Sequence, residues 1–179
     1  MHAKGAPESS GAPFANHLRG EGREDLVSDE CADPPVTAFT LYVRVLSETI
    51  SPDEIGARLG VPADESYAAG SRKHPRAMPR THNRWVRHAR SPEPGARPED
   101  LERIVTGWGT PFARALGTLV DSGEASVSLV LVQQVHDLDD EMALGIVLSA
   151  ELVTWLALAR ADVDMDQYIF HECDESADA

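Results

Sequence analysis

The chain has 179 residues, of which 42% are hydrophobic, and its net charge is −14, so it is an acidic protein of the length expected for one domain. Its apolar runs are too short to span a membrane, and its N-terminus lacks the basic and apolar parts of a secretory signal. Two peripheral cysteines, Cys31 and Cys173, exclude a disulfide framework, and we expect a cytoplasmic protein.

Composition divides the chain into three parts. Residues 1–35 are rich in glycine, proline and charge and show almost no hydrophobic periodicity, which predicts a disordered N-terminal arm. Residues 36–170 carry the periodic hydrophobic segments and are predicted to form a single α+β domain. Residues 171–179 are predicted to be an acidic C-terminal tail.

The domain begins with alternating hydrophobic and polar residues from Val36 to Leu46, which predict a half-buried strand. A short helix should follow, because Ser51 and Glu54 form a capping box and Pro52 occupies the first helical position. Gly60 is the residue type that ends a helix in the left-handed conformation. The first unit of the domain is therefore a strand followed by a helix.

Residues 63–81 have no usable period, and their glycine, prolines and basic residues predict a long basic loop. Residues 82–90, around Trp85, are predicted to form a second strand. A helix should begin near Pro98 and break between Gly107 and Pro111, because proline removes an interior hydrogen bond. A second helical piece then runs to about residue 121, with Trp108 and Phe112 as core residues at the break.

The last part of the domain contains the strongest strand signal, from Ser126 to His136. Alternation resumes at residues 142–148 after a short polar segment, which predicts a β-hairpin. A helix should start at Ser149 and bury four residues, Leu152, Val153, Leu156 and Ala159. A final strand is predicted over residues 163–170, with Val163 and Met165 pointing inward.

The predicted order is β-α-β-α-β-β-α-β, an α+β fold with a mixed or antiparallel five-stranded sheet and helices on one face. The unit around Ser51, continuing to Tyr67, resembles the unit around Ser149, which continues to Tyr168. Two related halves of this kind would give a ferredoxin-like pseudo-duplication.

A family resemblance rests on several of these segments. They are Ser51 to Ile55 at the helix start, Leu59 to Pro62, Gly70 in a basic stretch, Trp85 in a short strand, and Leu148 to Tyr168. Over about residues 38–170 the chain resembles the bacterial domain of unknown function 4279 (DUF4279) family. The resemblance implies a small bacterial cytoplasmic α+β protein and transfers no catalytic residue. An accessory, immunity-like or protein-binding role follows from analogy alone.

Charge is distributed unevenly along the sequence. Residues 71–97 contain eight basic residues and Glu93, a local charge of +7, whereas residues 121–179 contain fourteen acidic residues and Arg160, a local charge of −13. Such blocks either pair within the fold or face partners of opposite charge. The sequence leaves both alternatives open.

Two segments contain residue types that bind metals, but neither predicts a metal site or a cofactor. Asp162, Asp164 and Asp166 have the spacing of a calcium-loop start, yet the glycine and glutamate required later in such a loop are missing. We interpret these aspartates as the solvent-facing side of a strand. His171 to Asp174 offers zinc-ligand types without the second Cys or His pair that zinc sites use.

The basic segment is the one place where positive charge, hydrogen-bonding groups and an aromatic side chain gather. The candidate ligand-binding or partner-binding residues there are Arg72, Arg80, His82, Arg84, Trp85 and Arg87. Trp85 is better explained as a core or half-core anchor, and the arginines as complements of the acidic C-terminal half of the same fold. The net charge of −14 argues against nucleic acid.

No familiar catalytic signature is present, which favours a non-enzymatic protein-binding, accessory or immunity-like module. The partner would be another protein, basic where it meets the acidic C-terminal half. Two alternatives stay open: an anionic small-ligand binder or enzyme that uses residues 71–90, and an N-terminal arm that folds on a partner.

Overall fold

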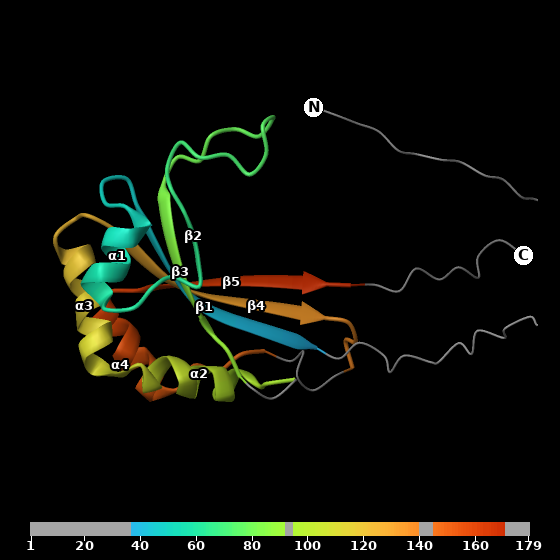
Figure 1. Ribbon diagram of the computed structural model, residues 1–179. Helices are drawn as coiled ribbons and strands as arrows, with labels where there is room; N and C mark the ends of the chain where they lie inside the picture. The colour runs from blue at the N-terminus through green and yellow to red at the C-terminus, as the bar shows by residue number, and fades with distance from the viewer. Residues whose placement is uncertain (1–36, 92–94, 140–144, 171–179) are drawn as a thin grey trace, which may run out of the picture. The chain divides into compact units, whose positions relative to one another are not determined.

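The computed structural model describes residues 37–91, 95–139 and 145–170; the predicted arm and tail lie outside them. Five strands and four helices confirm the predicted α+β class (Figure 1). Their bounds are β1 (Ala38–Ser47), α1 (Pro52–Leu59), β2 (Glu65–Tyr67), β3 (Asn83–Ala89), α2 (Pro98–Gly107), α3 (Gly109–Asp121), β4 (Ser126–Val135), α4 (Ala150–Ala159) and β5 (Asp162–Ile169). None of these helices has the length and apolarity that crossing a membrane would require.

The strands form one mixed sheet in the order β2-β3-β1-β4-β5. Neighbouring strands are antiparallel except for β4 and β5, which are parallel. Helix α1 joins β1 to β2 with β3 lying between them, and α2 and α3 join β3 to β4 with β1 between them. This is the split connection of a ferredoxin-like unit. The two segments compared as a repeat differ, because α4 joins β4 to its direct neighbour β5.

Two predicted segments differ from the structure. Residues Glu65–Tyr67, predicted to belong to a loop, form β2, which pairs with β3. Three residues are too few to show an alternating pattern, so this strand depends on its partner. The predicted hairpin strand at residues 142–148 is wrong where it can be seen, since residues 145–149 form no regular element; residues 140–144 lie outside the described residues.

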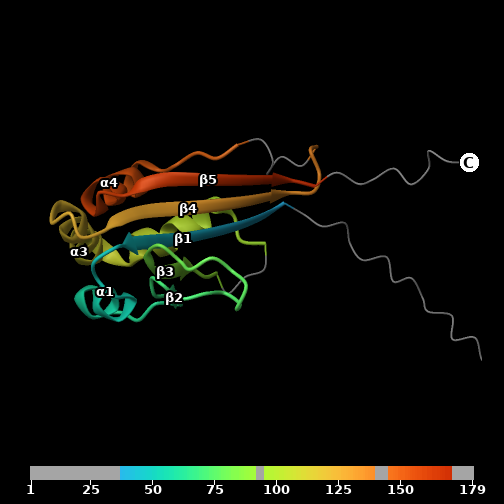
Figure 2. The same ribbon diagram turned by 90° about the horizontal axis from the view of Figure 1, so that it is seen from above.

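The helices cover one face of the sheet, and the core lies between them and the strands. Figure 2 looks onto the opposite face, with α2 and α3 behind the strands. Trp85 is fully buried on the helix side, where its ring lies 6.4 Å from that of Phe112. Trp108 and Trp155 extend this aromatic cluster, with ring centroids 6.3 Å apart. The predicted core roles of Trp85, Trp108 and Phe112 are therefore confirmed.

Helix ends follow from local capping. The Ser51 hydroxyl accepts a hydrogen bond from the Glu54 amide at 3.2 Å, and Gly60 ends α1 with φ of 73°. Ser149 caps α4 in the same way, and its own amide donates to the carboxylate of buried Glu102 at 3.1 Å. The Glu102 carboxyl group thus lies at the positive end of the α4 dipole.

Helix α4 buries Leu152, Trp155, Leu156 and Ala159, so Trp155 takes the place that the sequence analysis assigned to Val153. Val153 is 51% exposed. Positions 152, 155, 156 and 159 follow the 3.6-residue period of one helix face, and position 153 lies off that stripe.

The prediction that Val163 and Met165 point into the core is wrong. They share a sheet face with buried Leu129 and Leu131 of β4, yet they are 39% and 50% exposed. The reason is their position, because β5 is an edge strand. Alternation in the sequence identifies the face of a strand, but it cannot show how far the helix layer extends over that face.

Candidate functional site

The sheet face opposite the helices carries a layer of polar and aromatic side chains. Register places Tyr42 beside His88 and Tyr67 beside Arg84 on this open face. Val86 and Val130, also on this face, are fully buried, although none of the four described helices covers it. Long polar and aromatic side chains therefore cover these two apolar residues.

Arginine and tyrosine side chains stack on this face. The Arg80 guanidinium carbon lies 3.8 Å from the Tyr67 ring centroid, and that of Arg84 lies 5.8 Å from both the Tyr67 and Tyr42 centroids. Among the described residues, no carboxylate lies within salt-bridge distance of Arg80 or Arg84. The buried Arg84 Nε likewise has no hydrogen-bond partner within this part of the chain. Within the described part of the chain, the contacts of these two guanidinium groups are therefore with aromatic rings.

Two other groups of the open face, His88 and Arg44, have carboxylate partners within the fold. His88 Nε2 lies 3.0 Å from Glu65 Oε1, and the His88 ring lies 5.1 Å from that of Tyr42. Toward β5, Arg44 Nη2 donates to Asp164 Oδ2 at 2.9 Å. His88 and Arg44 thus each have a carboxylate within 3.0 Å, which distinguishes them from Arg80 and Arg84.

The segment between β2 and β3 brings further positive charge to this side. It rises away from the helix layer (Figure 1). Its base continues the ladder of the two strands, with Gly70 N donating to Arg80 O at 2.8 Å and Arg80 N donating to Ser71 O at 2.9 Å. Within it, Arg72 Nη1 donates to the Ala77 carbonyl at 2.6 Å. A backbone hairpin therefore orders what the sequence presents as a loop, and it fixes Arg80 above Tyr67.

The six candidate residues do not gather at one place. Arg80 and Arg84 lie on the open face and Arg72 lies in the β2–β3 segment, whereas His82 lies near Glu48, with Nε2 3.4 Å from Oε1. Trp85 is in the core.

Arg87 also lies on the helix side, with its guanidinium 4.3 Å from the Trp108 ring centroid. Burial lowers the pKa of the Arg87 guanidinium, and the carboxylate of Asp64 opposes that shift. The candidate site is therefore narrower than predicted, since neither Trp85 nor Arg87 contributes to the open face.

Comparison with known proteins gives one match. A family model described as a domain of unknown function (DUF4279) covers residues 37–170, from the start of β1 to the end of β5. The chain belongs to the DUF4279 family. Neither a curated protein nor a solved structure matches the chain. The family assignment confirms the resemblance seen in the sequence. The family description supplies no activity, so any function of this DUF4279 domain is inferred from the geometry of its own residues.

Tyr42, Tyr67 and His88 are the site residues that the sequence analysis did not select. Tyr42 and His88 fall on the polar side of their strands in the sequence pattern, which is the available signal. Their proximity to Arg84 depends on strand register, since β1, β2 and β3 bring together residues that are up to 46 positions apart, from Tyr42 to His88.

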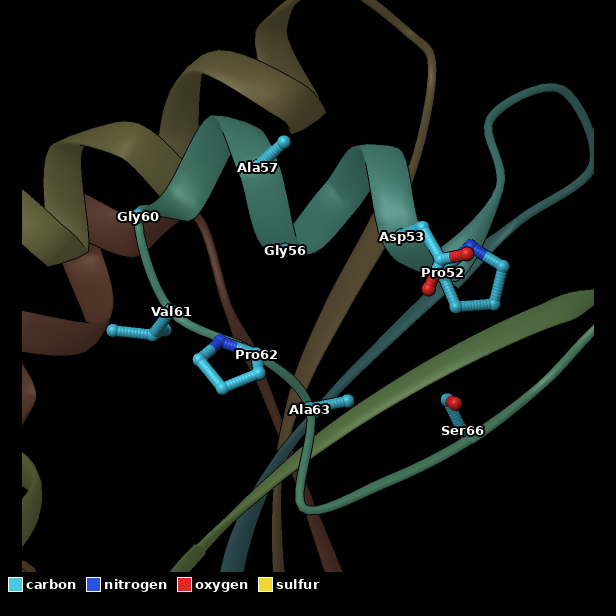
Figure 3. Close-up of a pocket in the computed structure, with 9 residues that line it drawn as sticks. All are labelled: Pro52, Asp53, Gly56, Ala57, Gly60, Val61, Pro62, Ala63 and Ser66. Carbon is cyan, nitrogen blue, oxygen red and sulfur yellow. The ribbon is translucent and has the colours of Figure 1, made fainter.

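The DUF4279 domain also has a surface pocket of about 450 Å³ between α1 and β2. Figure 3 shows α1 along one side of it, the turn after Gly60 at its end, and Ser66 of β2 on the other side. Asp53 and Ser66 supply its polar side-chain groups. A single carboxylate and a single hydroxyl do not form an acid–base pair or a metal site, and no cluster of metal-ligand types occurs among the described residues.

The three aspartates of β5 lie on one face of an edge strand. Asp162, Asp164 and Asp166 alternate along an extended strand. Alternate residues of a strand are roughly 6.6 Å apart, so their carboxylates spread along the edge and do not converge on one ion.

Proposed function

We propose that this DUF4279 domain is a non-enzymatic binding protein whose open face holds an acidic segment of a partner protein. One observation carries the proposal: the guanidinium groups of Arg80 and Arg84 are stacked on tyrosines, with no carboxylate in salt-bridge distance among the described residues. An accessory or immunity-like role in a bacterial cytoplasm is the setting that we propose for it.

Stacking supports binding because it positions the guanidinium without using its hydrogen-bond donors. A guanidinium that lies over an aromatic ring still directs its N–H groups sideways, and these groups match a carboxylate in a bidentate manner. The half-buried rings of Tyr42 and Tyr67 beside Arg84 offer apolar surface to side chains that flank the acidic residue. Desolvation by such flanking contacts strengthens the ion pair.

The overall charge favours a short acidic segment over a polyanion. At a net charge of −14, nucleic acid is repelled at long range, whereas local attraction acts within about 8 Å at physiological ionic strength. Lys73 and Arg76, which have no carboxylate within salt-bridge distance among the described residues, lie in the raised β2–β3 segment and add local positive charge. The proposed contact is therefore local and salt-sensitive.

A peptide titration tests the proposal. The ¹⁵N-labelled protein is titrated with a peptide of alternating glutamate and serine, and chemical shifts should change around Tyr42, Tyr67 and Arg84. The R80Q/R84Q variant should lose these changes. The matched R103Q/R114Q variant removes two positive charges from exposed positions on α2 and α3 and should keep them. Identical behaviour of the two variants, or no shift at saturating peptide, would overturn the proposal.

A second candidate is an anionic small ligand bound at the same place, which the position of Arg84 between Tyr42 and Tyr67 favours. An enzyme working there would use His88, beside Glu65, for proton transfer. A thermal-shift screen of phosphates, nucleotides and carboxylates should then raise the melting temperature in proportion to ligand concentration, and R80Q/R84Q should abolish the rise. A flat response across the screen would remove this candidate.

A further inference from the structure

The outer edge of β5 is a second surface with a distinct character. β5 is the last strand of the sheet, and among the described residues no strand pairs with its outer side. It has eight residues, from Asp162 to Ile169, which is long for an unprotected edge. Edge strands of this length present a row of backbone donors and acceptors and are usually shortened, bulged or covered.

The pairing with β4 shows which backbone groups point outward. Phe170 N donates to Val135 O at 2.9 Å, so the even-numbered residues direct their N–H and C=O groups toward β4. Because these directions alternate along a strand, the odd-numbered residues direct theirs away from the sheet. The outward groups belong to Val163, Met165, Gln167 and Ile169.

The side chains of the same strand divide into an apolar row and an acidic row. Val163, Met165 and Ile169 are 39%, 50% and 46% exposed on the helix side of the sheet. Asp162 and Asp166 are exposed on the open face, where Asp164 pairs with Arg44. An added strand would therefore meet apolar side chains on one face and carboxylates on the other.

We propose that the outer edge of β5 accepts an extended strand of a partner protein in which basic side chains alternate with apolar ones. The added strand bonds to the outward backbone groups, its apolar side chains pack beside Val163 and Met165, and its cationic side chains lie beside Asp162 and Asp166. Backbone hydrogen bonds supply affinity and the alternating side chains supply specificity in this mode of recognition.

Charge complementarity selects this partner over a second copy of the chain. An antiparallel copy centred on Met165 places Asp164 opposite Asp166, and one centred on Asp166 places that residue opposite itself. Like charges directly opposite each other on neighbouring strands are destabilising. The net charge of −14 adds repulsion between copies and attraction for a basic strand.

A set of capped eight-residue peptides tests the proposal on the full chain. A fluorescent peptide of alternating arginine and valine should bind, whereas a peptide of alternating glutamate and valine should not. In NMR spectra of the ¹⁵N-labelled protein, the chemical-shift changes caused by the arginine–valine peptide should be confined to β5 and its neighbours. The same arginine and valine residues arranged in two blocks should bind far more weakly, and so should the alternating peptide N-methylated at every second residue. Equal binding by the blocked or N-methylated peptide would indicate unspecific charge attraction and would overturn strand addition.

Variants locate the binding site. Asp162→Asn with Asp166→Asn should weaken binding roughly 2- to 30-fold, as expected for the loss of two exposed ion pairs. The matched change Asp139→Asn with Glu151→Gln removes two exposed carboxylates outside β5 and should alter affinity less than about 2-fold. Equal effects of the two double variants would contradict the assignment to β5. Sedimentation tests the choice of partner. A dimer that the Met165→Lys change dissociates would show that a second copy of the chain occupies the edge, and it would overturn the proposed basic partner.

This site is independent of the proposed function, since the peptides carry opposite charge. Loss of arginine–valine binding in a β5 variant should leave the glutamate–serine response at Arg80 and Arg84 unchanged. The R80Q/R84Q variant should lose the glutamate–serine response and keep its binding of the arginine–valine peptide.

Discussion

The two faces of the sheet are made by the same strands and differ in what covers them. On the helix side, Val43, Trp85 and Leu129 are fully buried. On the open side, Arg84 and His88 keep partial exposure, and the fully buried apolar residues are Val86 and Val130. One layer of backbone therefore separates the packed core from the stacked arginines, so that the adjacent residues Arg84 and Trp85 lie in different surroundings.

The largest effect should come from the helix side. Trp85→Ala removes the largest fully buried side chain, and we expect a loss of about 3–5 kcal/mol in the free energy of unfolding. Urea denaturation followed by circular dichroism measures it. Trp85→Phe keeps most of the ring volume and should cost clearly less. If Trp85→Ala unfolds like the parent, the helix side does not hold the stability that we assign to it.

Close packing between two helices should give the next largest effect. A methyl group added at Gly117 of α3 would clash with the Leu158 carbonyl oxygen of α4. Gly117→Ala should therefore destabilise the fold by about 1–3 kcal/mol, because backbone has to move.

Gly107→Ala is the matched control, since nothing lies within 4 Å of a methyl group there. It should be neutral or should stabilise the helix by up to about 1 kcal/mol. Equal melting temperatures for the two variants would contradict the tight approach of α3 and α4.

The smallest effect is expected on the open side. Arg44 and Asp164 form an ion pair at 2.9 Å with side chains that are 26% and 43% exposed. A double-mutant cycle with Arg44→Gln and Asp164→Asn should give a coupling energy below about 1 kcal/mol, and it should shrink as salt is added. A coupling several times larger would mean that the open face contributes to stability as much as the helix side does.

The strands and helices with strong local signals were predicted well. Capping residues around Ser51 and Ser149 mark helix starts because the hydroxyl itself satisfies a free amide, and no distant residue is needed. Continuous β-branched and aliphatic residues mark β4 for a similar reason. Trp85 was also correctly assigned to the core.

The errors occur where local signals are weak or misleading. Strand β2 has three residues and exists through its pairing with β3. Residues 145–148 alternate in sequence, yet Ile146 and Leu148 pack against the core without forming a strand. Val163 and Met165 alternate with aspartates, as the buried residues of a strand alternate with polar ones, but their position in an edge strand leaves them exposed.

The candidate site was predicted in part. Arg80 and Arg84 were selected because positive charge gathers in their segment, which is visible in the sequence. Tyr42 and Tyr67 were not selected, because they join Arg84 only through strand pairing. Trp85 and Arg87 were included in the site, although a strand sends successive side chains to opposite faces.

The sequence by itself determined the α+β class, the family, the helix ends and the residues that form the central strands, because capping, periodicity and hydrophobicity act over a few neighbouring residues. Tertiary structure alone decided the strand order, the face that stays open and the exposure of β5. Those features depend on pairings between distant segments, and no pattern within a single segment encodes which strand becomes an edge.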